Sequence, residues 1–326
     1  MNLIRQYIDY IRVVRRYSPR TVSIYESALS DFASARDVVD DASLLKALNL
    51  SELRSYQVSM LDRASLSPKT VNLNMSVLSG FCRFLIQKGV LRSNPVSLLS
   101  RPKVGRRIPE FYKQESMEDY FRKTEYVSSA DALDAFLQAP DTDTGCHLYE
   151  GRLARLIISL LYGLGVRRSE LIGMTLGNID FGRKVVKIHG KGDKMREIPL
   201  VDSLSEEILL YLKAVEALCG GERSLNEPLL VTYRQKPLYP VYVDRAVKSE
   251  LGSVEGVMGR KSPHVLRHTI ATQLLNEGSD LHSIKEMLGH SSMATTQIYT
   301  HSSIAQLKNI FKQAHPRAKN GGKYGN

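Results

Sequence analysis

The sequence predicts a mainly α-helical protein of two domains, the second of which contains a small β-hairpin. Apolar residues recur at three- and four-residue spacing through the first hundred residues, and two short β-type runs occur at 185–189 and 196–200. A proline-containing stretch without periodicity separates two helical regions. Because 326 residues suffice for two domains, we expect domains over 1–105 and 128–326, joined by a linker over 106–127.

Composition excludes several classes of protein. An apolar content of 43% argues against intrinsic disorder, and no uncharged apolar run approaches the roughly 18 residues of a membrane span. Asp9 and Arg12 interrupt the first apolar stretch, so it does not predict a signal peptide. We therefore expect a cytoplasmic protein without membrane contact. Three scattered cysteines indicate neither a disulfide framework nor a thiolate zinc site: Cys82, Cys146 and Cys219.

Positive charge is concentrated in the first third of the chain. The net charge is +11, and residues 1–107 hold 17 Lys and Arg against 8 Asp and Glu, whereas 108–326 hold 28 against 26. A folded basic module of this kind suits a surface that lies along nucleic-acid phosphates. A basic solvated surface without a ligand explains the charge equally well.

A weak repeat in this basic region predicts two helix starts. SPRTVSIYESALSDF begins at Ser18 and SPKTVNLNMSVLSGF at Ser67, and the two are identical at eight of fifteen positions. Serine as the N-cap with proline next is typical of a helix start. Free N–H groups, a hydroxyl and a cation there suit a phosphate, although two capped core helices need no ligand. The candidate DNA-binding residues are Arg20, Thr21, Lys69 and Thr70.

The second region continues as helices around the hairpin. Helical patterns cover 129–138, 149–163 and 168–175, and Gly-Lys-Gly-Asp between the two β-type runs predicts a tight turn. A last amphipathic segment, 303–312, precedes a tail that we expect to be disordered.

Reactive side chains gather in four segments of the second domain, of which two are basic. Arg167 and Arg168 open a helix next to Glu170, which makes an anion site by geometry, and Lys191 occupies the hairpin turn. A surface arginine paired with Glu170 and a solvated turn lysine explain these segments without a function.

The other two segments supply histidines and a tyrosine. His264, Arg267 and His268 share one helical face, and His290 follows a predicted helix end, nine residues before Tyr299. The two histidines of the first group have the spacing of a zinc-protease motif. A valine replaces its glutamate and no third ligand is evident, so the spacing favours a zinc site only weakly.

Together these residues have a chemical logic that none has alone. Two arginines offer bidentate donors to the non-bridging oxygens of a phosphodiester, a lysine and two histidines move protons, and a tyrosine hydroxyl attacks phosphorus. Fixed guanidinium charge then stands in place of Mg²⁺. The set predicts phosphodiester transfer that requires no metal or other cofactor.

Four segments resemble, in residue pattern and in order, the Arg, Lys, His-x-x-Arg, His and Tyr boxes of the tyrosine recombinases, or phage-integrase family. The segments are GVRRSEL, GKGDKMREIPL, HVLRHTIAT and LGHSSMATTQIYTH. The Xer recombinases are the most similar subgroup in style and length. The resemblance is strong over 151–312 and rests on general architecture over 1–107. It implies a SAM-like helical core-binding domain, a catalytic domain of helices with a small sheet, and a clamp on duplex DNA.

The resemblance also implies a role for each residue of the boxes. Glu170 resembles the family's acidic residue behind the site, whereas Arg168 stands where the family has an apolar or small residue and competes for the role of Arg167. The roles are phosphate clamping by Arg167 and Arg267, protonation of the departing 5′ oxygen by Lys191, proton transfer by His264, a hydrogen bond to phosphate from His290, and formation of a 3′-phosphotyrosyl link by Tyr299.

Partners follow from the same resemblance. It implies double-stranded DNA, a tetramer on DNA with segment 303–312 docked into a neighbouring protomer, and a second recombinase or an accessory protein as a further partner. Integration, inversion, and chromosome or plasmid dimer resolution use the same boxes. Two other classes stay open at this point: a DNA-relaxing enzyme of the type IB topoisomerase kind, and a non-catalytic DNA-binding architectural protein.

Overall fold

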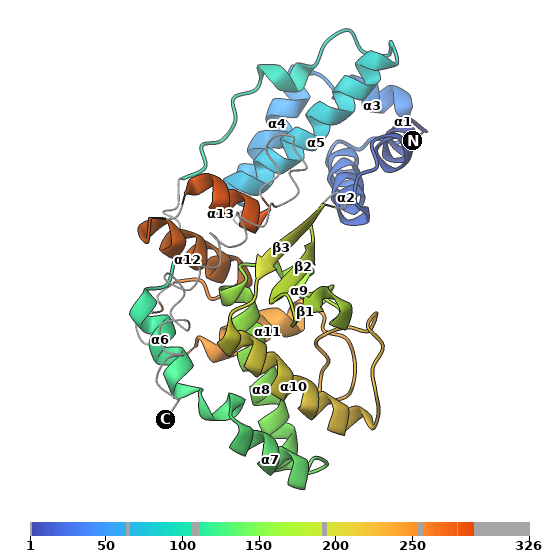
Figure 1. Cartoon of the computed structure of the whole chain (residues 1–326). Coiled ribbons are helices and arrows are strands. Elements are labelled where there is room, and N and C mark those ends of the chain that lie inside the picture. Colours follow the sequence, from blue (N-terminus) through green and yellow to red (C-terminus); the bar gives the residue numbers. More distant parts are fainter. Residues whose placement is uncertain are drawn as a thin grey trace. The chain divides into compact units, whose positions relative to one another are not determined.

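A computed structural model of the chain separates it into two compact units, Met1–Arg107 (unit 1) and Ile108–Asn326 (unit 2) (Figure 1). Each unit is considered by itself. The structure describes residues 2–62, 66–105, 111–190, 194–252, 254, 257, 259–278 and 280–289.

Unit 1 is built from helices, as the spacing of its apolar residues predicts. The predicted starts at Ser18 and Ser67 are confirmed, because each serine hydroxyl accepts a hydrogen bond of 3.2 Å from the amide three residues on, with proline at the first helical position. Its elements are α1 (Asn2–Asp9), a π-helical turn η1 (Tyr10–Val14), α2 (Pro19–Ala35), α3 (Asp41–Ala47), α4 (Leu50–Asp62), α5 (Pro68–Gln87) and the 3₁₀ turn η2 (Pro95–Leu98).

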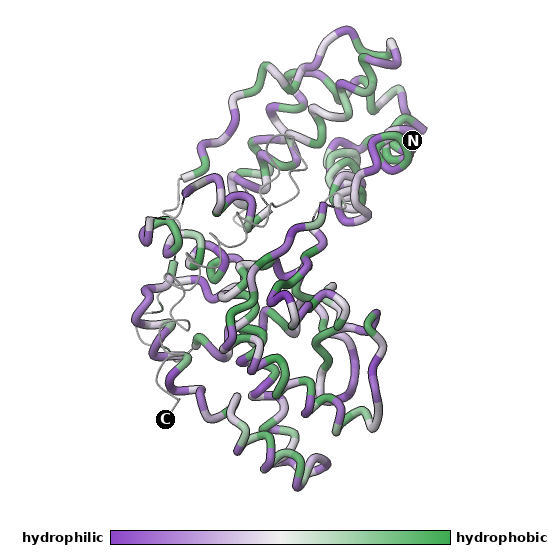
Figure 2. The backbone as a smooth tube through the Cα atoms, viewed as in Figure 1, coloured by the Kyte–Doolittle hydropathy of each residue, from purple (hydrophilic) through white to green (hydrophobic). Residues whose placement is uncertain are grey.

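Each long helix of unit 1 buries one face. Leu29 and Phe32 of α2, Leu53 of α4, and Leu78 and Phe81 of α5 are fully buried in one cluster. Hydrophobic and hydrophilic segments accordingly alternate along these helices (Figure 2). Unit 1 therefore has a hydrophobic core of its own, and its described basic residues other than Arg36 are exposed.

The segment expected as a linker over 106–127 differs from that expectation. Within it, α6 (Gln114–Lys123) is a regular helix, and Met117, Tyr120 and Phe121 are buried in the core of unit 2. Their spacing of three and four residues is helical, but the prolines and basic residues just before them hid this short period in the sequence. This part of the chain therefore belongs to unit 2.

Unit 2 combines helices with one small antiparallel sheet in the order β1-β2-β3. The predicted hairpin is confirmed, because β2 and β3 pair from Val185↔Pro199 to His189↔Met195, while the two-residue strand β1 was not expected. The remaining elements are η3 (Tyr126–Ser128), α7 (Ala130–Gln138), α8 (Asp143–Gly163), α9 (Arg168–Ile172), η4 (Leu176–Asn178), β1 (Ile179–Asp180), β2 (Val185–His189), β3 (Met195–Pro199), α10 (Asp202–Cys219), α11 (Pro240–Glu250), α12 (Pro263–Asn276) and α13 (Leu281–Leu288).

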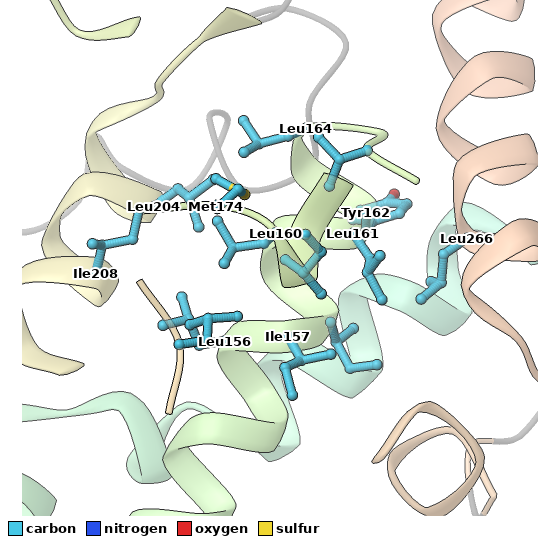
Figure 3. Packing of buried hydrophobic residues seen from close by; sticks show 14 of the residues in the cluster. Leu156, Ile157, Leu160, Leu161, Tyr162, Leu164, Met174, Leu204, Ile208 and Leu266 are labelled. Atoms are coloured by element: carbon cyan, nitrogen blue, oxygen red, sulfur yellow. The ribbon is translucent and has the colours of Figure 1, made fainter. Parts of the chain in front are cut away.

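The central element of unit 2 is α8, which packs against α7, α10, α11 and α12. Figure 3 shows Leu156 and Leu160 of α8 between Leu204 and Ile208 of α10 on one side and Leu266 of α12 on the other. All five side chains are buried, so α8 holds α12 firmly in the unit. None of the helices that the structure describes is long and apolar enough to cross a membrane.

Candidate active site

The chain turns sharply between α8 and α9, and this turn brings the first predicted box against α12 and α13. Gly165 has a φ of +59°, and a Cβ there would lie 2.8 Å from Leu288 Cδ2 and 3.2 Å from Ile270 Cγ2. Glycine is therefore needed both for the backbone conformation and for the close approach. The turn leads directly to Arg167, the N-cap residue of α9.

Glu170 is the centre of a buried group of charged side chains. It accepts hydrogen bonds from the Arg167 amide (2.8 Å to Oε2) and from Arg167 Nη1 (2.6 Å to Oε1). Arg196 of β3 binds the same carboxylate with both terminal nitrogens, at 3.0 and 2.7 Å, and Arg267 Nη1 of α12 lies 3.9 Å from Oε2. We name these four residues the Glu170 cluster; three guanidinium groups face one carboxylate, which leaves two positive charges in excess.

The same three arginines bind the end of α13. Gly289 closes this helix with a φ of +63°, and helix C-termini favour cations because their last carbonyls are free. Three consecutive carbonyls each accept from a different arginine: Met287 O from Arg196 Nε (2.7 Å), Leu288 O from Arg267 Nη2, and Gly289 O from Arg167 Nη2 (2.8 Å). Gly289, the residue before His290, is thus in contact with the Glu170 cluster.

The charges of the cluster shift its pKa values in opposite directions. Burial by itself raises the pKa of Glu170, but hydrogen bonds from Arg196 and from the Arg167 amide outweigh burial and lower it to about 2. Burial and the nearby charge of Arg167 lower the pKa of Arg267 to about 10. At neutral pH Glu170 and Arg267 are therefore both ionised.

Two histidines lie on the exposed face of α12, one turn apart. His264 Nε2 and His268 Nε2 are 3.1 Å apart. Partial burial, His268 and the charge of Arg267 lower the pKa of His264, so its imidazole is neutral at neutral pH and able to accept a proton. Among the described residues, no group of three or more His, Cys, Asp or Glu side chains is arranged to hold a metal ion.

Comparison with known proteins assigns this chain to a family. The pattern of the Phage integrase family matches residues 129–306, and that of the phage integrase N-terminal SAM-like domain matches residues 4–89. Tyrosine recombinase XerC of Chlorobaculum parvum is 32% identical over 323 residues, which cover 96% of this chain and 94% of the relative. The chain belongs to the phage integrase family. It is a tyrosine site-specific DNA recombinase.

Solved structures of integrases share the fold. A Tn1549 transposon integrase in complex with transposon right end DNA has a TM-score of 0.65 at 19% identity, with 98% of this chain and 97% of that chain covered. A lambda integrase tetramer bound to a Holliday junction has a TM-score of 0.58 at 19% identity, with 91% and 80% covered. The expected fold of a SAM-like helical domain and a recombinase catalytic domain is therefore confirmed.

The structure separates the two adjacent arginines of the first recombinase box. Arg167 lies in the Glu170 cluster, whereas Arg168 forms an ion pair with Asp244 of α11. Arg167 is the N-cap residue of α9 and Arg168 is its first residue, and the two side chains bind carboxylates on different helices. Of the two, only Arg167 shares a carboxylate with Arg267.

The structure brings together half of the predicted catalytic residues. Arg167 and Arg267 meet at Glu170, and His264 is one turn from Arg267 on α12, whereas Lys191, His290 and Tyr299 lie outside the described residues. The residues just before two of these do reach the cluster. A Cβ on Gly190 would lie 3.9 Å from Glu170 Oε1, and the Gly289 carbonyl accepts from Arg167.

Sequence reasoning missed Arg196. Its neighbour two positions on, Ile198, is fully buried, and alternation along β3 places both side chains on one face. An arginine on the buried face of a predicted strand was the available signal, since such a charge requires a partner inside the protein.

The candidate DNA-binding residues all lie at the two capped helix starts of unit 1. The Arg20 and Lys69 side chains are exposed, while the Thr21 and Thr70 hydroxyls lie 2.8 and 3.0 Å from their capping serines. Thr70 also lines an open groove with other polar residues of α2 and α5, which are Ser23, Ser27, Asp31, Ser34 and Asn74.

Proposed function

We propose that this recombinase cuts and rejoins duplex DNA through a 3′-phosphotyrosyl link to Tyr299, without metal or ATP. The observation that carries the proposal is the charge of the Glu170 cluster, in which two positive charges remain after Glu170 is paired. A phosphodiester is an anion whose two free oxygens match guanidinium donors. Arg167, with 36% of its side chain exposed, offers this charge to a ligand, and Arg267 supports it from behind.

Cleavage then proceeds by transfer of one phosphodiester bond. The Tyr299 hydroxyl attacks phosphorus and passes its proton to His264, whose neutral imidazole is suited to accept it. The bond from phosphorus to the 5′ oxygen breaks, and that oxygen takes a proton from Lys191. Arg167 and Arg267 stabilise the charge on the non-bridging oxygens, and His290 donates a hydrogen bond to the phosphate.

Rejoining is the reverse reaction with a different strand. The 5′ hydroxyl of the incoming strand attacks the phosphotyrosyl ester and gives its proton back to Lys191, while Tyr299 leaves and recovers its proton from His264. The number of phosphoester bonds is unchanged, so no ATP is consumed. Family membership supports recombination over a type IB relaxing enzyme and over an architectural protein.

The DNA-binding arrangement follows from the two units. Unit 1 acts as the core-binding domain, with Arg20 and Lys69 on phosphates, and unit 2, which includes α6, acts as the catalytic domain on the same duplex. Exchange between two duplexes needs four such chains, joined through segment 303–312. The lambda integrase tetramer on a Holliday junction supports this number. Integration, inversion and dimer resolution share the chemistry and differ in target sequence.

Covalent trapping tests the proposal. The protein is incubated in EDTA with nicked duplex fragments of the source genome, in which the nick prevents rejoining, and adducts are isolated on a denaturing gel and sequenced. The wild-type protein should give an adduct on a 3′ phosphate, whereas Tyr299→Phe should bind the same DNA and give none. An adduct formed by Tyr299→Phe would show that the nucleophile is another residue.

A further inference from the structure

Arg196 connects three elements of unit 2 through one buried side chain. It projects from β3, binds both oxygens of Glu170 at the start of α9, and donates from Nε to Met287 O at the end of α13. Only 7% of its side chain is exposed. The sheet does not require these contacts, because the backbone of β3 pairs with β2 along its whole length.

Two glycines leave room for its guanidinium group. A Cβ on Gly190 would lie 3.4 Å from Arg196 Nη1, and a Cβ on Gly289 would lie 3.1 Å from the same nitrogen and 3.4 Å from Cζ. Gly190 directly precedes Lys191, and Gly289 directly precedes His290. The guanidinium therefore occupies the space that a side chain would fill at the residues just before Lys191 and His290.

Arg196 also determines how much positive charge the Glu170 cluster holds in excess. Its two terminal nitrogens each bind one oxygen of the carboxylate, and such a bidentate pair is among the strong hydrogen-bonded arrangements in proteins. Without this pair, the negative charge of Glu170 would be balanced by Arg167 and Arg267 alone, and the excess within the cluster would fall from two charges to one. The remaining arginines would then attract a phosphate less strongly.

We propose that Arg196 is a positioning residue for strand cleavage: by joining β3 to the start of α9 and the end of α13, it fixes Glu170 behind the arginines that bind the phosphate. It also fixes the positions of Gly190 and Gly289, which precede Lys191 and His290 in the sequence. The inference rests on the proposed function of the cluster. Arg196 itself is not placed to touch substrate, because its side chain is buried and each of its three nitrogens donates to Glu170 or to Met287 O.

Arg196→Lys tests the proposal, because lysine keeps the charge and loses the planar fork. Arg183→Lys is the matched control: Arg183 lies just before β2 of the same hairpin and binds both oxygens of Glu197 at 3.0 Å, with 51% of its side chain exposed. On the nicked duplex that the wild type cleaves, Arg196→Lys should slow single-turnover cleavage by about 10- to 100-fold, as for other residues that orient a site from behind. Its affinity for the duplex should stay within about twofold, and the control should keep both quantities within about twofold.

A second measurement does not depend on cleavage. Amide hydrogen exchange of α13 in the DNA-free protein should become faster in Arg196→Lys and stay unchanged in Arg183→Lys, since α13 loses one of its three carbonyl contacts. If the wild type forms no adduct, the proposed function fails, while the exchange data still decide whether Arg196 holds α13.

Three outcomes would overturn the inference: unchanged α13 exchange, unchanged cleavage, or a loss of cleavage matched by an equal loss of affinity. Should Arg196→Lys fail to fold, as judged by its thermal midpoint, Gly190→Ala keeps Arg196 and places a Cβ 3.2 Å from the Lys194 carbonyl oxygen and 3.4 Å from Arg196 Nη1, so it disturbs the place where the hairpin meets the guanidinium. This variant should cleave more slowly than the wild type with duplex affinity unchanged, and wild-type cleavage would count against the proposal.

Discussion

At two places, the described part of unit 2 buries arginines together with a glutamate, and the two clusters differ in access to solvent. The first, which we name the α8 cluster, comprises Arg152, Arg155, Ser159 and Glu207. Arg155 Nε lies 3.3 Å from Glu207 Oε1, and Ser159 donates to the same oxygen at 3.0 Å. The second is the Glu170 cluster.

Both clusters use arginines to hold the backbone of a neighbouring segment. In the α8 cluster, Arg155 donates to Phe121 O at 2.9 Å and Arg152 donates to Ser129 O at 2.7 Å, which fixes α6 and the turn after it. In the Glu170 cluster the corresponding carbonyls belong to the end of α13.

The α8 cluster and the Glu170 cluster differ in the solvent exposure of their side chains. The side chains of Arg155 and Glu207 are 3% and 2% exposed, whereas that of Arg167 is 36% exposed and the exposed His264 lies on the adjoining helix. The α8 cluster can only stabilise the fold, while the Glu170 cluster can also receive an anion. A buried charged group therefore indicates a functional site only when part of it faces solvent.

The largest expected effect breaks the α8 cluster. Glu207→Gln removes the carboxylate beside buried Arg155 and should lower the free energy of unfolding by about 3–5 kcal/mol, the usual cost of leaving one buried partner alone. Urea denaturation measures this change. Glu197→Gln, at the surface pair with Arg183, is the control and should cost less than about 1 kcal/mol. Cleavage per folded molecule should be normal in both variants; slower cleavage by folded Glu207→Gln would place this cluster in the site.

The next effect concerns the ionisation of Glu170. Its folded-state pKa is about 2 against an ordinary value of 4.5, so it stabilises the fold above pH 4.5 and loses this contribution as the pH falls towards 2. The loss amounts to about 3 kcal/mol at full protonation. The free energy of unfolding, measured by urea denaturation between about pH 5 and pH 3, should fall less steeply in Glu170→Gln than in the wild type. Equal slopes would mean that ionised Glu170 adds nothing to the fold.

The smallest expected effect belongs to Arg168, the arginine adjacent to Arg167. Arg168→Ala removes a partly exposed pair with Asp244 and should change cleavage by less than about threefold and unfolding by less than about 1 kcal/mol. Arg167→Ala should slow single-turnover cleavage by about 100-fold or more, because it removes a donor to the transition state. The opposite ranking of the two variants would move the phosphate clamp to Arg168.

Local features of the fold were predictable from the sequence. The Ser-Pro helix starts at 18 and 67 and the hairpin around 190–194 depend on residues within a few positions of one another, and each was found where expected. Helix α6 was missed because a proline-rich stretch precedes it and because its buried face is completed by the core of unit 2, which no local pattern reveals.

For the site, the sequence by itself determined the order of the boxes, and with it the recombinase family and the chemistry proposed for Arg167, Arg267 and His264. Only the tertiary structure decided that Arg167 and not Arg168 meets Glu170, and that Arg196 completes the cluster. The physical reason is that spacing along a helix or strand determines which side chains share a face, whereas contacts between α9, β3, α12 and α13 depend on how these elements pack.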